Sequence, residues 1–184
     1  MIIATGGAGF IGSTLVDLIL SDNLKSITHE VTVLDSLTYA GNLKNLEQCM
    51  GNRNFQFIHG SINDFPLVES LIAETDIVIN LAAETHVDRS IVSPVEFIET
   101  NINGTINVLE ICKASNYARA IICITTDKVY KNNIYKKCYS EDDALQGEDP
   151  YSASKASADI IANSYLKSFF SKYTYPRFDR ASPI

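Results

Sequence analysis

Tyr151 and Lys155 stand four residues apart at the start of a predicted helix, in a spacing that suits acid–base chemistry. Residues at i and i+4 lie on one face of a helix. A free tyrosine titrates at about pH 10 and is a poor base at neutral pH, but a neighbouring ammonium and a cationic nicotinamide ring stabilise the phenolate. Thr126, at the end of a predicted strand, adds a hydroxyl upstream. These side chains predict removal of a proton from a carbinol whose hydride passes to a nicotinamide.

A glycine-rich turn near the start of the chain has the pattern of a phosphate-binding turn. It lies between a short apolar run and an apolar-periodic segment, an order that places a dinucleotide pyrophosphate at a helix N-terminus. Gly7, Gly9 and Gly12 fit G-x-G-x-x-G, and Gly6, Gly9 and Gly12 fit G-x-x-G-x-x-G. We expect an early glycine to allow the tight turn, Gly9 to let phosphate approach the backbone, and Gly12 to let the helix pack close to the strand.

An acidic residue at the end of the second predicted strand indicates which dinucleotide is bound. Asp35 follows the apolar run Val31 to Leu34, where a carboxylate accepts both ribose hydroxyls and repels a 2′-phosphate. This position favours NAD over NADP. We expect Phe10 and Ile11, at the start of the first helix, to approach the pyrophosphate through their backbone amides.

The composition limits the class of protein and its partners. A chain of 184 residues with 46% hydrophobic and 20% charged residues is long enough for one globular domain with a real core. A net charge of −7 argues against nucleic acid or an anionic membrane as the main partner. Cys112 and Cys123 lie in apolar runs without a C-x-x-C motif, so we predict buried thiols and no metal site. With no signal peptide or bilayer-spanning run in the sequence, we predict a cytoplasmic protein.

Apolar β-type runs alternate with helical patterns along the chain. The predicted strands are Ile2 to Thr5, Val31 to Asp35, Gln56 to His59, Asp76 to Leu81 and Ala120 to Thr125. The predicted helices are Gly9 to Ser21, Asn42 to Met50, Pro66 to Glu74, Val95 to Ser115 and Pro150 to Phe170. This order predicts an α/β Rossmann fold over residues 1–184, a doubly wound parallel sheet with helices on both faces. We expect the strand from Ala120, nearly all apolar, to be buried on both faces.

The end of the chain fits this pattern less well. Lys172 to Ile184 should supply a sixth strand, but Tyr175 to Arg180 alternates charge where a buried strand needs aliphatic residues. Pro176 also removes a ladder donor. We therefore expect an edge strand or a frayed end.

Longer strings in the sequence resemble the extended short-chain dehydrogenase/reductases, as do the glycine turn, the acidic residue and the Tyr/Lys pair described above. Leu34 to Leu43 and Asn80 to Ile91 are similar to the matching segments of dTDP-glucose 4,6-dehydratases. Thr100-Asn101 and Gly104-Thr105 resemble the long helix of those enzymes. The resemblance extends to about Phe170 and implies an NAD-dependent nucleotide-sugar 4,6-dehydratase, with dTDP-glucose as the favoured substrate.

A third motif tests this resemblance. A 4,6-dehydratase oxidises C4 of the sugar, eliminates water across C5 and C6 and returns the hydride to C6, so it needs an acid for the C6 hydroxyl and a base for the C5 proton. The dTDP-glucose enzymes have an Asp-Glu pair after the threonine, and this chain has Asp127-Lys128 after Thr126. Asp127 carries over as the acid, and Lys128 replaces the glutamate as the candidate base.

The Asp-Lys pair leaves the nucleotide open. It resembles CDP-glucose 4,6-dehydratases and some UDP-sugar dehydratases, and Glu141 to Lys155 also resembles the CDP-glucose group. A lysine acts as a base only when it is deprotonated, which burial or a nearby cation favours. The alternative is a solvent-facing Lys128 that only fills the turn.

The resemblance also implies a wider set of binding residues. The expected cofactor-binding residues are Gly6, Gly9, Phe10, Ile11, Gly12, Asp35, Ser36, Thr38, Ile62, Leu81, Ala82, Ala83, Tyr151 and Lys155. Ile62 follows Ser61, where the family usually has an aspartate, so it keeps the packing on adenine without the carboxylate. Leu81 to Ala83 would line the cofactor through their backbone, or are simply strand core. We expect His86 and Thr126 to contact the nucleotide sugar, although His86 is alternatively a capped loop histidine.

Members of this family continue well beyond residue 184 into a region that grips the nucleotide sugar. We therefore expect this chain to be C-terminally truncated relative to them, with most of the sugar-binding region absent. The two long predicted helices, Val95 to Ser115 and Pro150 to Phe170, form a dimer interface in such enzymes, so the resemblance implies a homodimer.

Two other functions remain open. A nucleotide-sugar C4 epimerase needs Thr126, Tyr151 and Lys155 but no elimination pair, so Asp127-Lys128 speaks against it. A catalytically silent NAD-binding module, which pairs with another subunit, is the other alternative.

Overall fold

The computed structural model describes residues 1–21, 29–132 and 138–170 and divides the chain into two compact units. Unit 1 comprises Met1–Ala83 and Asn107–Ile124. Unit 2 comprises Glu84–Ile106 and the described part of Thr125–Ile184. The assignment of all 184 residues to one NAD-binding domain stays a prediction. The predicted edge strand in Lys172 to Ile184 lies outside the described residues.

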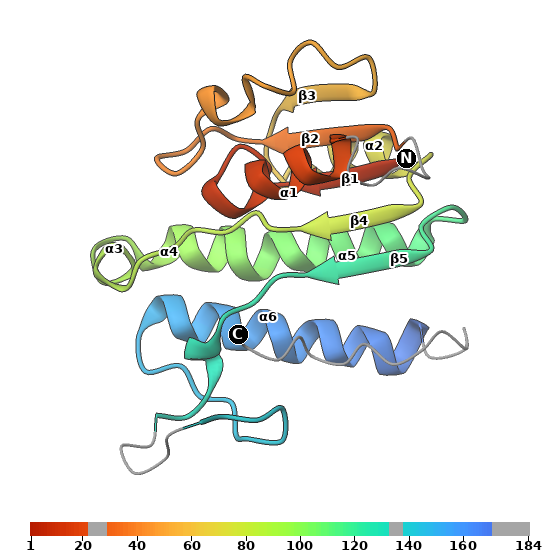
Figure 1. Ribbon diagram of the computed structural model, residues 1–184. Helices are drawn as coiled ribbons and strands as arrows, with labels where there is room; N and C mark the ends of the chain where they lie inside the picture. Colours follow the sequence, from red (N-terminus) through yellow and green to blue (C-terminus); the bar gives the residue numbers. More distant parts are fainter. Residues whose placement is uncertain (22–28, 133–137, 171–184) are drawn as a thin grey trace. The chain divides into compact units, whose positions relative to one another are not determined.

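Unit 1 is built on a parallel sheet, whose five arrows run side by side in the same direction in Figure 1. Its strands are β1 (Ile2–Thr5), β2 (Val31–Asp35), β3 (Phe55–His59), β4 (Ile77–Asn80) and β5 (Ala120–Cys123). The strand order is β3-β2-β1-β4-β5, with every neighbouring pair parallel. The chain thus leaves β1 in one direction for β2 and β3, and returns on its other side for β4 and β5. This confirms the doubly wound fold and puts the switch point, where such sheets bind ligands, between β1 and β4.

The first two helices of unit 1 match the predicted segments to within a few residues, which is the usual uncertainty of helix ends. The helices of this unit are α1 (Phe10–Leu20), α2 (Phe65–Ile72) and, from residue 107 onward, α5 (Thr105–Ala114), with the 3₁₀ turn η2 (Leu43–Leu46) replacing the predicted Asn42 to Met50 helix. In Figure 1, α1 lies in front of the strands and α5 behind them. The core beside the sheet includes Ala4, Val16 and Val33, all fully buried.

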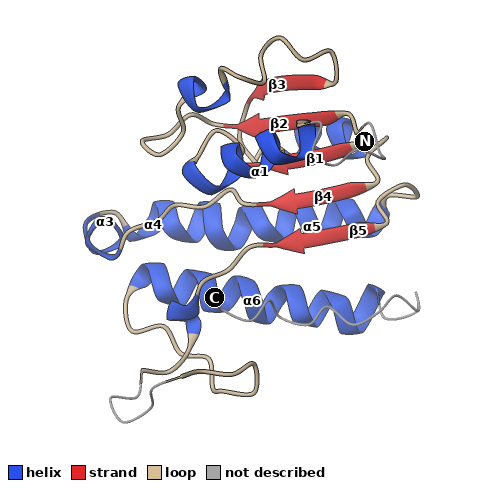
Figure 2. Cartoon of the chain, in the orientation of Figure 1, coloured by secondary structure: helices blue, strands red, loops and turns tan. Residues whose placement is uncertain are grey.

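Unit 2 consists of helices joined by loops, as the colouring of Figure 2 makes clear. Its elements are α3 (Val87–Val92), α4 (Pro94–Phe97), the π-helix η3 (Ile98–Gly104), the 3₁₀ turn η4 (Asp127–Val129), α6 (Pro150–Tyr165) and the π-helix η5 (Leu166–Phe170). The predicted Val95 to Ser115 helix is therefore interrupted by a π-helical stretch. The six-residue α3 was not predicted, because its segment is too short to show a helical period.

The fifth strand is less buried than its apolar sequence predicted. Ile122 and, just beyond the strand, Ile124 are exposed, with 37% and 36% of their surface accessible. The reason is that β5 is hydrogen-bonded to β4 and lies at the edge of the described sheet. A strand at an edge has one side without a strand neighbour, so an apolar run alone does not ensure its burial.

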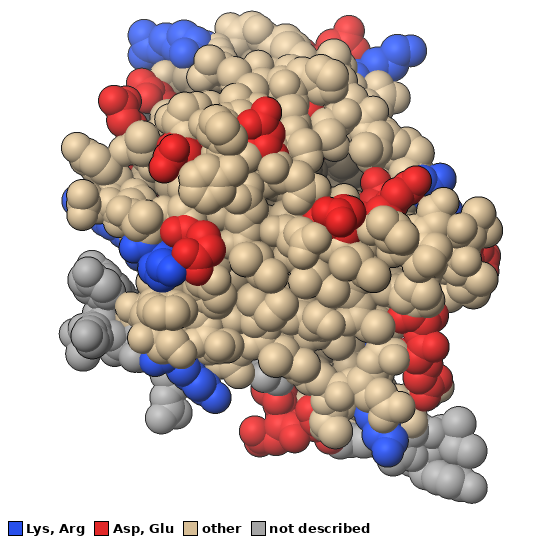
Figure 3. Space-filling view, turned by 180° about the vertical axis from the view of Figure 1, so that it is seen from behind, with Lys and Arg blue, Asp and Glu red and all other residues tan. Residues whose placement is uncertain are grey.

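On the face drawn in Figure 3, acidic and basic side chains lie in small groups, and most of that face is uncharged. Among the described residues, no helix is both long enough and apolar enough to cross a bilayer.

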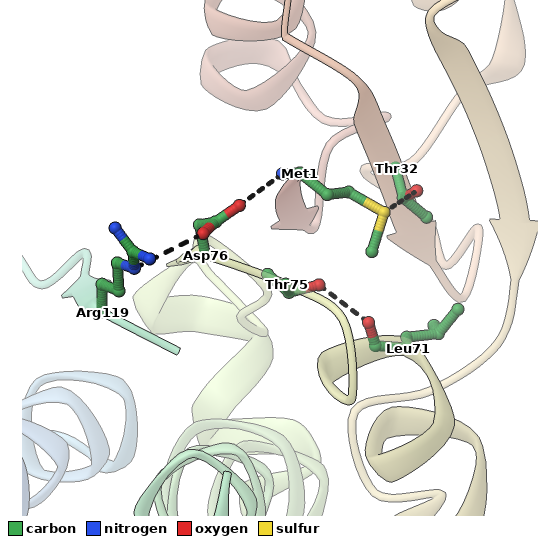
Figure 4. Close-up of polar contacts among 6 residues, drawn as sticks. All are labelled: Met1, Thr32, Leu71, Thr75, Asp76 and Arg119. Atoms are coloured by element: carbon green, nitrogen blue, oxygen red, sulfur yellow. Dashed lines mark hydrogen bonds and ion pairs between the residues drawn. The ribbon is translucent and has the colours of Figure 1, made fainter. Parts of the chain in front are cut away.

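Asp76 ties together the N-terminal ends of three strands (Figure 4). Its Oδ2 atom accepts a 2.7 Å hydrogen bond from the amine of Met1, and Arg119 Nε lies 3.7 Å from Oδ1. Its backbone carbonyl accepts the amides of Arg119 and Ala120 at the start of β5. The hydrogen bond and charge of the Met1 amine, followed by the Arg119 charge, lower the pKa of the Asp76 carboxyl below its ordinary value of 3.8.

We expect Asp76→Asn to lower the free energy of unfolding at neutral pH. Because the pKa of Asp76 is lower in the folded chain, its contribution is fully present above the ordinary value of 3.8 and is lost as the pH falls through the lowered pKa. Urea unfolding of both chains at decreasing pH measures this, and the two curves should converge in acid. Arg119→Gln serves as the comparison and should have the smaller effect. A deficit for Asp76→Asn that does not change with pH would contradict the assignment.

Candidate functional site

The glycine turn of unit 1 is held close to the backbone that follows β4. Gly6 has a φ of 68°, a conformation that favours glycine, and a Cβ built there would lie 2.6 Å from the backbone nitrogen of Ala82. A Cβ at Gly12 would collide with the carbonyl oxygen of Gly6. Gly6 thus serves the tight turn as predicted, whereas Gly12 lets α1 pack against the turn itself rather than directly against the strand.

Gly9 differs from these glycines because nothing in the protein crowds it. A Cβ at Gly9 would meet one neighbour, the carbonyl oxygen of Gly6, at an ordinary contact distance of 3.4 Å. Gly9 is also the N-cap of α1, which has no side-chain cap, whereas Asp64 caps α2 and Asp149 caps α6. The first amides of α1, which include those of Phe10 and Ile11, therefore lack a side-chain cap at the positive end of the helix dipole, an arrangement that accommodates an anion.

Asp35 is buried at the end of β2 and fixes this turn. Its Oδ2 atom accepts the amide of Ala8 at 2.9 Å, and Oδ1 accepts the amide of Leu37 at 2.8 Å. A carboxylate has about four acceptor positions, so these two bonds leave capacity for hydroxyl donors. Asp35 therefore positions the glycine turn in addition to the ribose-binding role predicted from the sequence.

The remaining predicted cofactor residues of unit 1 follow the same edge of the sheet. Ser36 and Thr38 are exposed just beyond β2, and Leu81 to Ala83 are half-buried just beyond β4. Thr5 secures the β4 end, since its hydroxyl donates to Asn80 Oδ1 at 2.6 Å and accepts the Ala82 amide at 3.3 Å. Because β1, β2 and β4 run parallel in register, their carboxyl ends bring these segments to the switch point.

Ile62, predicted to pack on adenine, is only 4% exposed. Its carbonyl accepts the side-chain amide of Asn107 at 2.6 Å. Its side chain is thus mostly enclosed by protein, and a contact with adenine stays a prediction.

The predicted acid and base lie on a short turn in unit 2. Thr126 is the N-cap of η4, and its hydroxyl accepts the Lys128 amide at 3.4 Å and donates to Asp127 Oδ1 at 3.2 Å. Asp127 and Lys128 are both exposed, which is the environment of a solvated residue rather than of a buried base. The turn packs against α6, the helix that carries Tyr151 and Lys155.

The start of α6 is strongly fixed. Asp149 accepts the backbone amide of Ser152 at 2.9 Å and its hydroxyl at 2.6 Å. Tyr151 is half-buried, and its ring meets the buried ring of Phe97 edge-on, with centroids 6.2 Å apart. Lys155, one turn further, is 7% exposed. The predicted Tyr/Lys pair thus lies on a capped, well-packed helix, beside the turn that carries Thr126, Asp127 and Lys128.

A buried asparagine that sequence reasoning gave no role connects these elements. The Asn101 side chain donates to the carbonyl of Glu84 at 2.9 Å and to the Ser154 hydroxyl at 2.8 Å, and accepts the Glu84 amide at 2.9 Å. Ser154 in turn donates to the carbonyl of Tyr151 at 2.7 Å. Asn101 lies inside the π-helix η3, and such π-helical turns often occur at functional sites. The available sequence signal was a polar residue on the apolar face of a predicted helix.

His86 and the cysteines complete the predicted residues. His86 is exposed at the N-cap of α3 with a φ of 72° and makes no side-chain cap of that helix, and its contact with a nucleotide sugar stays a prediction. A positive φ in a bulky residue is a strained conformation.

Cys112 is buried as predicted, and burial raises the pKa of its thiol to about 12. Cys123 is half-buried, less than predicted, because it lies on the edge strand β5.

Comparison with known proteins gives consistent matches. A family model described as GDP-mannose 4,6 dehydratase matches residues 3–178. The low-salt glycan biosynthesis protein Agl12 of Haloferax volcanii is 42% identical over 89% of this chain and 51% of its own length. A dTDP-glucose 4,6-dehydratase of Streptomyces niveus is 43% identical over 88% of this chain and 48% of its own length.

A solved structure agrees with these matches. A double mutant of DesIV, a dTDP-glucose 4,6-dehydratase from Streptomyces venezuelae crystallised with NAD and a second ligand, superposes with a TM-score of 0.87 at 36% identity. The alignment covers 92% of this chain and 52% of the DesIV chain. The chain spans about half the length of the relatives it matches.

We expect Gly9→Ser and Gly12→Ala to have opposite effects on the free energy of unfolding. Gly9 has extended backbone angles that suit serine, whose hydroxyl would cap α1, so stability should stay the same or rise by roughly a few tenths of a kcal/mol. Gly12→Ala forces a methyl group against the Gly6 carbonyl and should cost about 1–3 kcal/mol. Chemical denaturation measures both. Similar losses in the two variants would show that the space at Gly9 is not open.

Proposed function

The chain belongs to the GDP-mannose 4,6-dehydratase family, and on this premise we propose that it catalyses NAD-dependent 4,6-dehydration of a nucleotide-activated glucose. The product is the 4-keto-6-deoxy sugar. The observation that carries the proposal lies in unit 2, where α6 with Tyr151 and Lys155 packs against the turn that holds Thr126, Asp127 and Lys128. One compact unit therefore brings together the groups for oxidation and the groups for elimination.

The residues of unit 1 fit a bound dinucleotide. The open space at Gly9 and the first turn of α1, which has no side-chain cap, suit a pyrophosphate, and Asp35 keeps acceptor capacity for ribose hydroxyls. A 2′-phosphate close to the Asp35 carboxylate would be repelled, so NAD is favoured over NADP. A solved relative with NAD bound, DesIV, supports the same choice. When bound, NAD accepts a hydride from C4 of the sugar and returns it to C6.

The chain's own residues then move the protons. Tyr151, with Lys155 one helical turn away, takes the proton of the C4 hydroxyl as the C4 hydride departs, and Thr126 contacts the sugar through its hydroxyl oxygen. Lys128, in its neutral amine form, takes the C5 proton while Asp127, in its neutral carboxylic acid form, protonates the C6 hydroxyl, which leaves as water as the C5–C6 double bond forms. Return of the proton from Lys128 to C5 and of the hydride to C6 completes the product and restores Lys128. Proton exchange with solvent then restores Tyr151 and Asp127. Because Lys128 is exposed, a solvent-facing lysine that only fills the turn is the alternative.

The choice among nucleotides and reactions rests on the relatives and on one pair of residues. Relatives named dTDP-glucose 4,6-dehydratase favour dTDP-glucose, while the Asp127-Lys128 pair keeps CDP- and UDP-glucose as alternatives. Epimerisation at C4 needs no acid and base for water elimination, so the Asp127-Lys128 pair favours dehydration. A silent NAD-binding module and a cytoplasmic location both stay open to experiment.

We also propose a homodimer formed through the two long predicted helical segments, Val95 to Ser115 and Pro150 to Phe170. Val95, Ile98, Ile160 and Phe169 are exposed by 65%, 46%, 55% and 44%, on the two helical segments expected to pair with a second copy. Burial of exposed apolar side chains against a partner lowers the free energy of the assembly, so these residues favour association. The molar mass of the protein in solution, measured over a range of concentrations, tests this proposal. A monomer at all concentrations would rule the dimer out.

We expect the chain to convert dTDP-glucose to the 4-keto-6-deoxy product with NAD, and Tyr151→Phe to slow turnover by about 10²–10⁴-fold through loss of its acid–base group. Asp127→Asn should block water loss while NADH, formed by C4 oxidation, still accumulates. Tyr117→Phe, at a tyrosine that is 60% exposed in unit 1, is the matched control and should be fully active. Binding of NAD without product from dTDP-, CDP- or UDP-glucose would favour the silent module.

A further inference from the structure

The proposed elimination pair is exposed, so burial of its own side chains does not fix its position. Asp127 and Lys128 stand on η4, a turn of three residues whose one buried member is Val129. Elimination requires the acid and the base to be held in a defined geometry, and a small misplacement of catalytic groups is costly. Something outside the pair must therefore hold the turn.

A neighbouring segment in unit 2, the arm formed by residues 138–147, is paired with the end of this turn. Tyr130, the C-cap of η4, forms an isolated antiparallel bridge with Leu145. On either side of the bridge, the amide of Lys131 donates to the carbonyl of Ala144 at 2.7 Å, and the amide of Gln146 donates to that of Val129 at 2.8 Å. The backbone that follows Asp127 and Lys128 is thus clamped to the arm.

The arm adds an aromatic contact to this backbone clamp. The rings of Tyr130 and Tyr139 are stacked, with centroids 5.3 Å apart and planes only 5° from parallel. The arm next to Tyr139 is itself ordered by a local turn, because Asp143 Oδ2 accepts the Ser140 amide at 2.7 Å and the Asp143 amide donates to the Ser140 carbonyl at 3.0 Å. The backbone next to Tyr139 is therefore held by this local turn, and the face of the Tyr139 ring packs on Tyr130, the C-cap of η4.

The other end of the arm packs against the first turn of α6. A Cβ built at Gly147 would collide with the backbone of Ser152 and Ala153 in the first turn of α6. This contact lies immediately beside Tyr151. The arm thus contacts Tyr130, the C-cap of η4, through Tyr139 and Leu145, and it contacts the start of α6 through Gly147. It therefore sets the spacing between η4 and α6.

We propose that Tyr139 is a positioning residue for the elimination step. Through its stack on Tyr130, it holds Asp127 and Lys128 in a fixed position relative to α6. This inference rests on the proposed function. It concerns the step in which the C5 proton passes to the base and the C6 hydroxyl leaves as water with a proton from the acid. Oxidation at C4, which uses Tyr151 on the capped helix, does not depend on the stack.

The test compares Tyr139→Ala with Tyr139→Phe, which keeps the aromatic stack and removes only the hydroxyl. In Tyr139→Ala we expect faster hydrogen exchange at the amides of Lys131 and Gln146, the two bridge donors, with little change in α6. During turnover of dTDP-glucose with NAD, this variant should lose water about 10–100-fold more slowly and accumulate NADH, since oxidation continues. Tyr139→Phe should behave like the unaltered chain in both measurements.

Gly147→Ala provides an independent route to the same result. It pushes the arm away from α6 without altering either tyrosine, and it should also slow water loss more than oxidation. Exchange of the C5 hydrogen with solvent deuterium, followed by mass spectrometry, reports the elimination half of the reaction separately from the oxidation half.

The outcomes separate this inference from the proposed function. If the unaltered chain forms product and Tyr139→Ala loses water as fast as Tyr139→Phe, only the positioning role is wrong. Equal slowing of oxidation and elimination in Tyr139→Ala would show a merely structural residue and would also overturn it. If the unaltered chain gives no product with any of the three nucleotide sugars, the proposed function fails and the positioning role fails with it.

Discussion

Unit 1 depends on the two hydrogen bonds that the buried Asp35 carboxylate accepts from the backbone. One comes from Ala8 in the glycine turn and the other from Leu37 after β2. Hydrogen bonds to a charged group contribute about 1.5–3 kcal/mol each, enough to hold a turn whose glycines offer no side chains for packing. The turn is held from the β2 side, and the first turn of α1 has no side-chain cap, an arrangement that accommodates an anion. One side chain thus holds the glycine turn and is also the predicted ribose-binding residue.

Unit 2 is organised by a similar principle, with a buried polar side chain that joins separate segments. Asn101 satisfies both the amide and the carbonyl of Glu84 and also reaches Ser154 on α6. Buried polar groups are stable only when they are hydrogen-bonded, so these contacts permit one arrangement of η3 and α6. The start of α6 is consequently fixed by Asn101, by the Asp149 cap and by the Phe97 ring. Tyr151 and Lys155 occupy a rigid element, whereas the proposed elimination pair stands on an exposed turn that needs the arm.

The sequence predicted the sheet well because parallel strands leave continuous apolar runs. All residues of β2 are buried, and its predicted bounds are the observed ones. Features that depend on spatial neighbours were not predictable. The exposure of Ile122 follows from the place of β5 at the edge of the described sheet, and the bonds of Asn101 join positions 17 and 53 residues apart. Likewise, the motif located Lys128 without showing that it is exposed, and the helical period of Val95 to Ser115 gave no sign of the π-helix within it.

The central claim is that the glycine turn leaves the start of α1 open for the pyrophosphate of NAD. Calorimetric titration of NAD into the chain and into Gly9→Ser tests it most directly, because the serine fills that space and competes for the same amides. The account predicts that the unaltered chain binds NAD and that Gly9→Ser binds at least about tenfold more weakly, a loss of about 1.4 kcal/mol, while remaining folded. Equal affinity in the two chains, or no binding by the unaltered chain, would contradict it.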